Sequence, residues 1–528
     1  MTTATKAWSP YQEAVFRFMA ADGAGNGAVF AVAGSGKTST IEEGIRRMPS
    51  SQRVRYLVFN KRNADEAQRR MPPNCTPSTF HAAAMRAIVR AGHRATIDDQ
   101  KSRAMLRAWR AASRISDLEE RKLGPKAARL AGLGKNAGIG LLSPNDRPTW
   151  ERLIDHYGFD WELKADDWRG YVDPRANEDE IAIGVPMAEF RGLCLASALV
   201  REAPKTNTRD FDDMLYDAVR LGVSFEPVDM VVIDEAQDTN AIQRALLVQM
   251  LASSPGARLI AVGDPGQAIY GFRGADAGAM RLLSDQFACQ PLRLSVNYRC
   301  ARAVIEEARE IVPEISAHDA APAGSVEWEE QPTLDAFTPG DAVLCRTNAP
   351  LVRLALRLLA SRTPATILGR DIGRSLVALV DQLATTPGQG LDAFEDALKA
   401  HRDAEIAKLA KKGKDAQAEA LEDRCACVLA VIDSLAPHEA TVPGLREAIT
   451  ALFSDAEEYG AVTLASVHRS KGLEWPTVWI LNRDQMPHPR ARLPWEREQE
   501  QNLIYVATTR AKVDLRLVTK AALEKMLG

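Results

Sequence analysis

A glycine-rich turn between an apolar run and a helical pattern constrains this chain more than any other feature. Residues 28–32 are apolar, residues 33–36 read Ala-Gly-Ser-Gly, and Lys37 and Thr38 open a helix-like stretch. Backbone N–H groups of such a turn, the helix N-terminus and the lysine bind nucleotide phosphates, while the threonine hydroxyl suits magnesium. A tight turn without a ligand is the alternative, because Ala31 stands where the usual pattern has glycine. The turn predicts a nucleotide site on an α/β sheet.

Two adjacent acids follow a second apolar run. Residues 231–233 are Val-Val-Ile, and Asp234 and Glu235 come next. Ligands bind at the carboxyl ends of strands in α/β sheets, so Asp234 is suited to hold magnesium and Glu235 to orient or deprotonate an attacking water. An exposed acidic strand end is the alternative. Because that alternative leaves the glycine-rich turn unexplained, the two features together indicate a nucleoside triphosphate hydrolase.

The 528-residue chain is too long for one ordinary core, and its apolar strand-like runs form two groups. The first group comprises residues 28–32, 56–59, 228–233 and 259–262. The second comprises residues 342–345, 365–368, 462–467, 477–481 and 515–518. A long stretch without such runs interrupts each group. We therefore predict an α/β protein with two cores. The first core comprises residues 1–85 and 206–285 and is interrupted by a mainly helical insertion at 86–205. The second comprises residues 286–375 and 457–528 and is interrupted by a shorter, mainly helical insertion at 376–456.

The two insertions differ in composition. Residues 391–436 of the second are rich in helix formers with opposite charges at helical spacing, which favours a solvated helical hairpin. The first carries basic residues that are as consistent with phosphate contacts as with a solvated face: Arg121, Lys122, Lys126, Arg129 and Lys135.

The composition bears on the kind of site and on the cellular location that we expect. The formal net charge is -3, and the seven cysteines include no repeated Cys-x-x-Cys, so neither a basic overall field nor a zinc, iron–sulfur or disulfide framework is indicated. No run of eighteen apolar residues occurs, and the first fifteen residues lack the basic start and apolar run of a secretory signal. We expect a cytoplasmic protein without a membrane partner.

Four longer strings extend the pattern beyond the two phosphate-site motifs. They are VGDPGQAIYGFRGA at 262–275, LSVNYR at 294–299, VTLASVHRSKGLEW at 462–475 and NLIYVATTRA at 502–511. In this order the strings resemble the motifs of UvrD/Rep-type superfamily 1 DNA helicases, and the Phe-Asn-Lys at 59–61 resembles F-box DNA helicases of that family. The resemblance implies two RecA-like cores with ATP in the cleft between them, each carrying an accessory insertion.

The resemblance also implies roles around the nucleotide. Gln267 would sense the γ-phosphate, and Arg299 and Arg510 would be arginine fingers that stabilise the charge gathering on the phosphate oxygens. Tyr298 would stack on adenine and Glu474 would meet the ribose. The remaining implied nucleotide contacts are Gln12, Ala33, Gly34, Ser35, Gly36, Ser39 and Gly472, with Gln12 one residue out of the family's usual spacing.

Single strands are bound without sequence preference by aromatic side chains that stack on bases and by polar groups that meet phosphates. By resemblance, the candidates are Phe59, Asn60, Lys61, Thr79, Phe80, His81, Tyr270, Phe272, Arg346 and His468. For each aromatic residue, core packing is the alternative.

The sequence and the resemblance together predict an ATP- and Mg²⁺-dependent, DNA-stimulated ATPase. We expect it to be a single-stranded DNA translocase and 3′-to-5′ helicase that acts at single-strand/duplex junctions in repair or recombination. The alternative is a partner-dependent, ATP-gated DNA-binding subunit of a repair or antiviral nuclease complex, with weak unwinding alone. The short second insertion motivates that alternative. RNA is less favoured as the track, on resemblance only.

Overall fold

A computed structural model describes residues 8–20, 24–93, 96–157, 159, 161, 185–271, 274, 278–384, 390–410, 415–454, 460–489 and 491–527. The chain divides into two compact units. The first comprises Met1–Ala31 and Gly36–Leu294, and the second comprises Val32–Ser35 and Ser295–Gly528. No helix in the described ranges is both long and apolar enough to cross a membrane.

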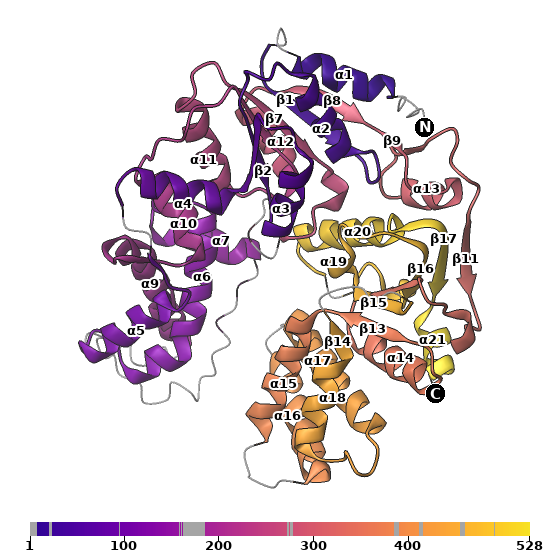
Figure 1. The fold of residues 1–528 in the computed structure, drawn as a ribbon. Helices are drawn as coiled ribbons and strands as arrows, with labels where there is room; N and C mark the ends of the chain where they lie inside the picture. Colours follow the sequence, from indigo (N-terminus) through magenta and orange to yellow (C-terminus); the bar gives the residue numbers. More distant parts are fainter. Residues whose placement is uncertain are drawn as a thin grey trace. The chain divides into compact units, whose positions relative to one another are not determined.

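The first unit contains a six-stranded parallel sheet in the order β3-β2-β6-β7-β1-β8 (Figure 1). Its strands are β1 (Gly27–Ala31), β2 (Val54–Val58), β3 (Cys75–Thr79), β6 (Met230–Ile233), β7 (Arg258–Gly263) and β8 (Gln290–Leu294). The helices that alternate with these strands are α1 (Pro10–Met19), α2 (Lys37–Arg47), α3 (Lys61–Arg70), α11 (Ala241–Ala252) and α12 (Ala279–Gln286). Because the strands are parallel, the residues that follow their carboxyl ends gather at one edge of the sheet.

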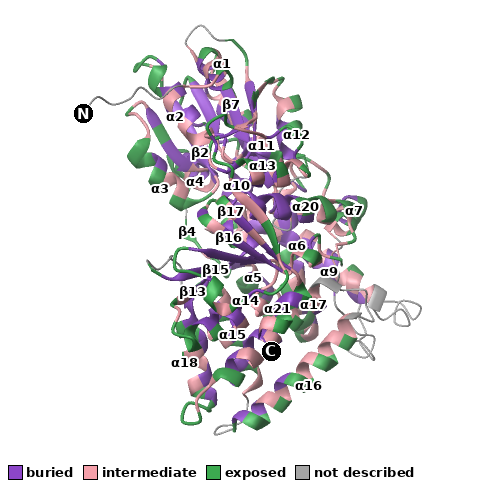
Figure 2. Cartoon of the chain, turned by 90° about the vertical axis from the view of Figure 1, so that its right-hand side faces the viewer, coloured by how far each residue is buried: buried purple, intermediate pink, exposed green. Residues whose placement is uncertain are grey.

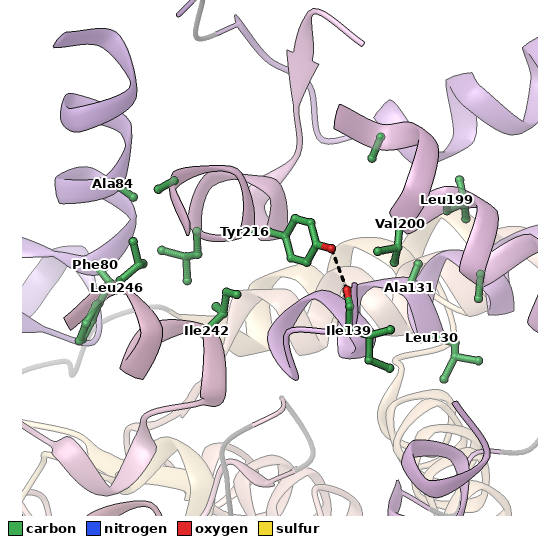
Figure 3. Packing of buried hydrophobic residues seen from close by; sticks show 14 of the residues in the cluster. Phe80, Ala84, Leu130, Ala131, Ile139, Leu199, Val200, Tyr216, Ile242 and Leu246 are labelled. Atoms are coloured by element: carbon green, nitrogen blue, oxygen red, sulfur yellow. Dashed lines mark hydrogen bonds between the residues drawn. The ribbon is translucent and has the colours of Figure 1, made fainter. Parts of the chain in front are cut away.

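A helical part adjoins this sheet in the first unit. It contains α4 (Phe80–Arg90), α5 (Lys101–Ala111), the π-helix η1 (Glu119–Leu123), α6 (Gly124–Asn136), α7 (Arg147–Tyr157), α9 (Val185–Glu202) and α10 (Phe211–Arg220). One apolar core runs through these helices, and Tyr216 Oη donates a 2.7 Å hydrogen bond to the carbonyl of Ile139 within it (Figure 3).

Lys135, one of the basic residues considered for phosphate contacts, is buried. Its ammonium lies 2.7 Å from Asp213 and 3.0 Å from Asp210, and Lys101 lies 2.5 Å from Asp213. Two cations and two carboxylates therefore neutralise one another inside the first unit. For Lys135, the phosphate-contact interpretation is wrong.

The second unit contains a seven-stranded parallel sheet in the order β11-β17-β16-β12-β15-β13-β14. Its strands are β11 (Ser325–Glu329), β12 (Ala342–Cys345), β13 (Ala365–Leu368), β14 (Phe453–Ser454), β15 (Val462–Ser466), β16 (Trp475–Leu481) and β17 (Ala511–Val518). The helices beside it are α13 (Arg302–Arg309), α14 (Ala349–Ala360), α19 (Val467–Ser470), α20 (Pro494–Thr508) and α21 (Lys520–Leu527). The predicted α/β class with two parallel sheets is confirmed.

The described residues of the second insertion form four helices: α15 (Arg370–Leu383), α16 (Leu391–Ala410), α17 (Asp415–Ser434) and α18 (Val442–Leu452). Buried residues of α17, including Cys427 and Val428, share one apolar cluster with Leu351 and Leu354 of α14. Figure 2 shows α16 as the more exposed of the long helices. The predicted helical hairpin is confirmed, because α16 and α17 pack on each other. It is not solvated on all sides, since residues of both helices belong to the apolar core of the second unit.

Candidate nucleotide and nucleic-acid sites

The glycine-rich turn joins β1 to α2 as predicted. Gly34 and Gly36 have φ values of 64° and 76°, a left-handed conformation that favours glycine. Gly36 is the N-cap of α2 and offers no capping side chain to the first turn. The Ser35 hydroxyl is buried and has no hydrogen-bond partner among the described residues. A helix N-terminus without a side-chain cap and an unpartnered buried hydroxyl fit a bound phosphate.

The predicted acids lie beside the first turn of α2, within the first unit. Lys37 Nζ is 3.6 Å from Glu235 Oε1, and Thr38 Oγ1 donates to Asp234 Oδ2 at 3.3 Å. Glu235 has a φ of 54°, which is uncommon for a residue with a side chain, and Gln237 Nε2 donates to its carboxylate at 2.5 Å. The geometry therefore fixes a carboxylate close to the lysine.

Tyr56 is a further residue of this group that sequence reasoning missed. It is buried on β2, next to β6, and its hydroxyl donates to Asp234 Oδ2 at 2.5 Å. Burial and the neighbouring charge of Glu235 raise the pKa of Asp234, while Lys37 opposes that rise. A tyrosine within an apolar strand gives no signal of this role, because packing alone accounts for it.

A magnesium ion would have Thr38 and Asp234 as protein ligands here. No group of three or more His, Cys, Asp or Glu residues suited to a metal occurs in the described part of the chain. Magnesium bound with a nucleotide commonly takes few protein ligands and completes its shell with phosphate oxygens and water. One hydroxyl and one carboxylate fit that requirement.

Gln267 and Gln237 extend the group through hydrogen bonds. Gln267 is buried, and its amide donates to Asp264 Oδ2 at 2.6 Å. The backbone N–H of Asp264 donates to Gln237 Oε1 at 3.0 Å. Since Gln237 also holds Glu235, a continuous chain of contacts joins the predicted γ-phosphate sensor to the predicted base. Gln237 was not identified from the sequence.

Gln12 is placed near the turn but is already hydrogen-bonded. Its Oε1 accepts from the backbone of Ser9, and its Nε2 donates to Thr40 Oγ1 at 3.1 Å. A Cβ atom built on Gly36 would lie 3.4 Å from Gln12 Nε2. Ser39 lies half-buried on α2. The adenine-side roles of both residues stay predictions.

The second unit gathers the other nucleotide candidates. Tyr298 is 41% exposed, and its backbone N–H donates to the carbonyl of Gly34 at 2.9 Å. Arg299 pairs with Glu474, and Lys512 lies 2.8 Å from the same carboxylate. Although burial opposes it, Lys512 and Arg299 hold the pKa of Glu474 below its ordinary value.

Arg510 lies beside this group. It is buried and donates to the carbonyl of Leu473 at 3.0 Å, while Arg299 Nη1 donates to the carbonyl of Thr509 at 3.4 Å. Gly472 has a φ of 91°, and among the described residues beyond its chain neighbours no atom lies within 4 Å of where a Cβ would stand. The structure brings these residues together, and their contacts with a nucleotide stay predictions.

A cavity of about 540 Å³ in the first unit collects most of the nucleic-acid candidates. Its lining residues are Phe59, Asn60, Lys61, Thr79, His81, Asn136, Phe211, Asp212, Leu215, Asp238, Asn240, Gln243 and Tyr270. Two stacked aromatic pairs stand in its wall. The rings of Phe59 and Tyr270 are 5.8 Å apart and nearly parallel at 4°, and those of His81 and Phe211 are 3.7 Å apart at 24°.

Sequence reasoning missed Phe211, Asp212 and Asn136 of this cavity. Phe211 is 57% exposed at the first residue of α10, where an aromatic side chain in the string Asp-Phe-Asp-Asp was the available signal. Burial raises the pKa of Asp212 to about 6, and Asn136 Nδ2 donates to its carboxylate at 3.2 Å. Burial also lowers the pKa of His81 to about 4, so His81 offers a neutral ring and no cation.

Three other nucleic-acid candidates fall elsewhere. Phe80 is 3% exposed and belongs to the core of the first unit, so its predicted contact with bases is wrong (Figure 3). Arg346 follows β12 and pairs with Glu500 at 2.8 Å. His468 is half-buried on α19. Phe272 lies outside the described residues.

Two family models match the chain. They are the UvrD/REP helicase N-terminal domain over residues 170–288 and the UvrD-like helicase C-terminal domain over residues 392–521. UvrD-like helicase domains are RecA-like, which agrees with the two parallel sheets. The predicted RecA-like architecture is confirmed.

Known relatives bear helicase names. The chain is 25% identical over 525 residues to F-box DNA helicase protein 1 of Schizosaccharomyces pombe, covering 92% of this chain and 54% of that protein. It is 26% identical over 566 residues to ATP-dependent DNA helicase UvrD2 of Mycobacterium tuberculosis, covering 93% and 76%. A stretch of 114 residues is 39% identical to ATP-dependent DNA helicase srs2 of S. pombe, covering 20% and 12%. The chain thus spans about half the length of the F-box protein and a small part of srs2.

Proposed function

The chain belongs to the UvrD/Rep-like helicases of superfamily 1, and on that premise we propose that it is an ATP-driven motor on single-stranded DNA. ATP hydrolysis with magnesium would move it along the strand and separate duplex at a junction, in repair or recombination. The 3′-to-5′ direction comes from the family resemblance.

Three short segments of the first unit carry this proposal. Each bears one residue of the nucleotide group and, three positions later, one residue that lines the cavity: Tyr56 and Phe59, Glu235 and Asp238, and Gln267 and Tyr270. A ligand that shifts the cavity residues therefore acts on backbone segments that also hold the carboxylates. This arrangement supports hydrolysis that responds to a bound strand.

The chemistry at the nucleotide group follows from its charges. Lys37 and the first turn of α2 would hold the phosphates, and Glu235 would take a proton from the water that attacks the γ-phosphorus as the bond to ADP breaks. Magnesium, when bound by Thr38 and Asp234, would neutralise phosphate charge. By resemblance, Arg299 and Arg510 would add positive charge to the transferring phosphoryl group.

Binding of the strand would depend mainly on aromatic stacking. Phe59, Tyr270 and Phe211 present ring faces that accept any base, and the exposed side chains of Asn60 and Lys61 suit backbone contacts. Stacking on ring faces tolerates any base. We expect movement along DNA that does not depend on sequence.

Steady-state ATP hydrolysis tests the proposal, measured with and without single-stranded DNA and alongside strand displacement on duplexes with a 3′ or a 5′ tail. Stimulation together with displacement from the 3′ tail is the expected result, and Lys37→Ala should abolish turnover in every assay. Absence of stimulation by DNA would overturn the motor assignment. The same ATPase measurement with an RNA strand of the same sequence shows whether DNA or RNA is the preferred substrate.

A second candidate is the partner-dependent, ATP-gated subunit of a nuclease complex. The observation that favours it is the second insertion, which is not a compact unit of its own and whose α17 shares the core of the second unit. Stimulation of ATP hydrolysis without strand displacement would support this candidate.

A further inference from the structure

The first helix after Arg346 is capped by a side chain from the second insertion. Helix α14 begins at Ala349, and its N-cap residue Asn348 makes no capping hydrogen bond of its own. Instead, Asp423 of α17 accepts from the backbone N–H groups of Asn348 at 2.9 Å and Ala349 at 2.6 Å. Its other oxygen accepts from Asn348 Nδ2 at 3.0 Å. One carboxylate therefore satisfies donors that a helix N-terminus leaves open.

Arg346 lies two residues before this cap and is itself held. Arg346 Nε is 2.8 Å from Glu500 Oε1, and the buried Glu500 also accepts from the backbone N–H of His488 at 3.1 Å. Cys345, just before Arg346, is buried in β12. The segment from Arg346 to Ala349 is thus fixed by Glu500 of α20 at one end and by Asp423 at the other.

Helix α17 is well placed to act as this support. Val428 and Val431 lie on its buried face, in the cluster that contains Leu351 of α14. On the same helix, Glu419 Oε1 is 2.6 Å from His488 Nε2. This packing and the contact between Glu419 and His488 hold α17 in place, and they thereby keep Asp423 beside the start of α14.

We propose that Asp423 is a positioning residue for single-stranded DNA: the second insertion uses its carboxylate to hold residues 346–349 where Arg346 meets the strand. This inference rests on the proposed function, and it takes Arg346 as the contact to the DNA backbone that the family resemblance implies. It assigns the short insertion a task within the motor, in place of a separate duplex-binding surface.

The test measures binding of a fluorescein-labelled dT oligonucleotide to the full chain by fluorescence anisotropy, with thermal unfolding and basal ATP turnover measured in parallel. Asp423→Ala should weaken binding about tenfold while basal turnover stays within about twofold, because a helix cap and a phosphate contact are local effects. Asp423→Asn keeps an acceptor oxygen and should recover part of the affinity. Asp433→Asn, an exposed carboxylate on the same helix, is the matched control and should match the wild type.

The possible results distinguish the role of Asp423 from the proposed function of the whole chain. Unchanged affinity in Asp423→Ala overturns the inference, and so does a parallel loss of basal turnover in both Asp423 variants, which marks a general structural role. If the wild type binds the oligonucleotide but its ATP turnover is not stimulated, the proposed function fails while the affinity comparison still decides the role of Asp423. If the wild type binds no oligonucleotide, both fail.

Discussion

Glu235 combines an uncommon backbone conformation with two polar partners. Its φ of 54° is costly for a residue with a side chain, and Lys37 and Gln237 hold the carboxylate on both sides. Such strain is retained where the surroundings require it, which fits a group that must meet a water molecule in one orientation. The residue is therefore the best single probe of the chemistry.

Replacing Glu235 with glutamine should separate binding from hydrolysis. The amide keeps the size of the side chain but cannot accept a proton, so turnover should fall by about 100-fold or more. ATP binding, followed by a fluorescent nucleotide, should change little because Lys37 and the turn remain. Turnover at the wild-type rate would show that another group deprotonates the water.

Tyr56→Phe removes one hydrogen bond from Asp234 and leaves the ring in place. Outer contacts of this kind orient metal ligands, so the magnesium concentration for half-maximal ATP turnover should rise about tenfold. The matched control is Tyr216→Phe, which removes a buried hydrogen bond to Ile139 without touching the nucleotide group. Equal magnesium requirements in the two variants would contradict a role for Tyr56.

Asp212 predicts a pH effect on stability. Its folded pKa of about 6 lies above the ordinary 3.8, so the folded chain holds a proton that the unfolded chain releases between about pH 4 and 6. The free energy of unfolding should therefore fall as the pH rises through this window, and a rise to about 6 corresponds to about 3 kcal/mol at most.

Urea unfolding of Asp212→Asn and the wild type, at pH 4 and pH 8, measures this effect. The variant should be the more stable protein at pH 8, and the difference should shrink at pH 4, where the wild-type carboxyl is protonated. A constant difference between the two proteins at both pH values would rule out the raised pKa.

At the scale of elements, apolar runs predicted strands well and polar strands poorly. Each predicted run coincides with a strand, but β3 reads Cys-Thr-Pro-Ser-Thr and the edge strand β11 reads Ser-Val-Glu-Trp-Glu. Their membership depends on pairing with β2 and β17, which no local pattern reports. Pairing with neighbouring strands therefore determines that these two segments are strands.

Local sequence patterns also identified only part of the predicted sites. Motif spacing located the phosphate turn and its acids, because those residues follow neighbouring strands of one sheet. The sequence predicts a nucleic-acid contact for both Phe80 and His81, yet of the two only His81 lines the cavity. Successive residues at the start of α4 point in different directions, and Phe80 enters the core. Phe211 reaches the cavity from a helix more than a hundred residues away in the sequence, a contact that only the fold creates.

The buried charge group joining α5, α6 and α10 should dominate the stability of that helical part. Asp213→Asn would leave two buried ammonium groups, Lys101 and Lys135, with less compensating charge, and should lower the free energy of unfolding by about 3 kcal/mol or more. Asp117→Asn breaks exposed pairs with Arg110 and Arg121 and should cost less than about 1 kcal/mol. Urea unfolding compares them, and equal losses would contradict the argument.

For the whole molecule, the slightly negative net charge does not favour DNA binding that is mainly electrostatic. The net charge is -3, and the cavity sets the carboxyl groups of Asp212 and Asp238 against the cation of Lys61. Because phosphate neutralisation needs clustered cations and Lys61 is the one Lys or Arg among the described residues of the cavity lining, stacked bases should supply much of the affinity at this cavity. The aromatic pairs are then the part of the first unit where a strand would most strongly affect ATP turnover.

Tyr270→Ala tests that link, because Tyr270 lines the cavity three residues after Gln267. Loss of one stacking platform is worth about 1 to 3 kcal/mol, so stimulation at a subsaturating DNA concentration should fall about tenfold. Basal turnover should stay within about twofold, since Gln267 keeps its bond to Asp264. Trp328→Ala removes an exposed aromatic residue from β11 and should leave both rates unchanged. If Tyr270→Ala lowered basal and stimulated turnover equally, the ring would be supporting Gln267 and not the strand.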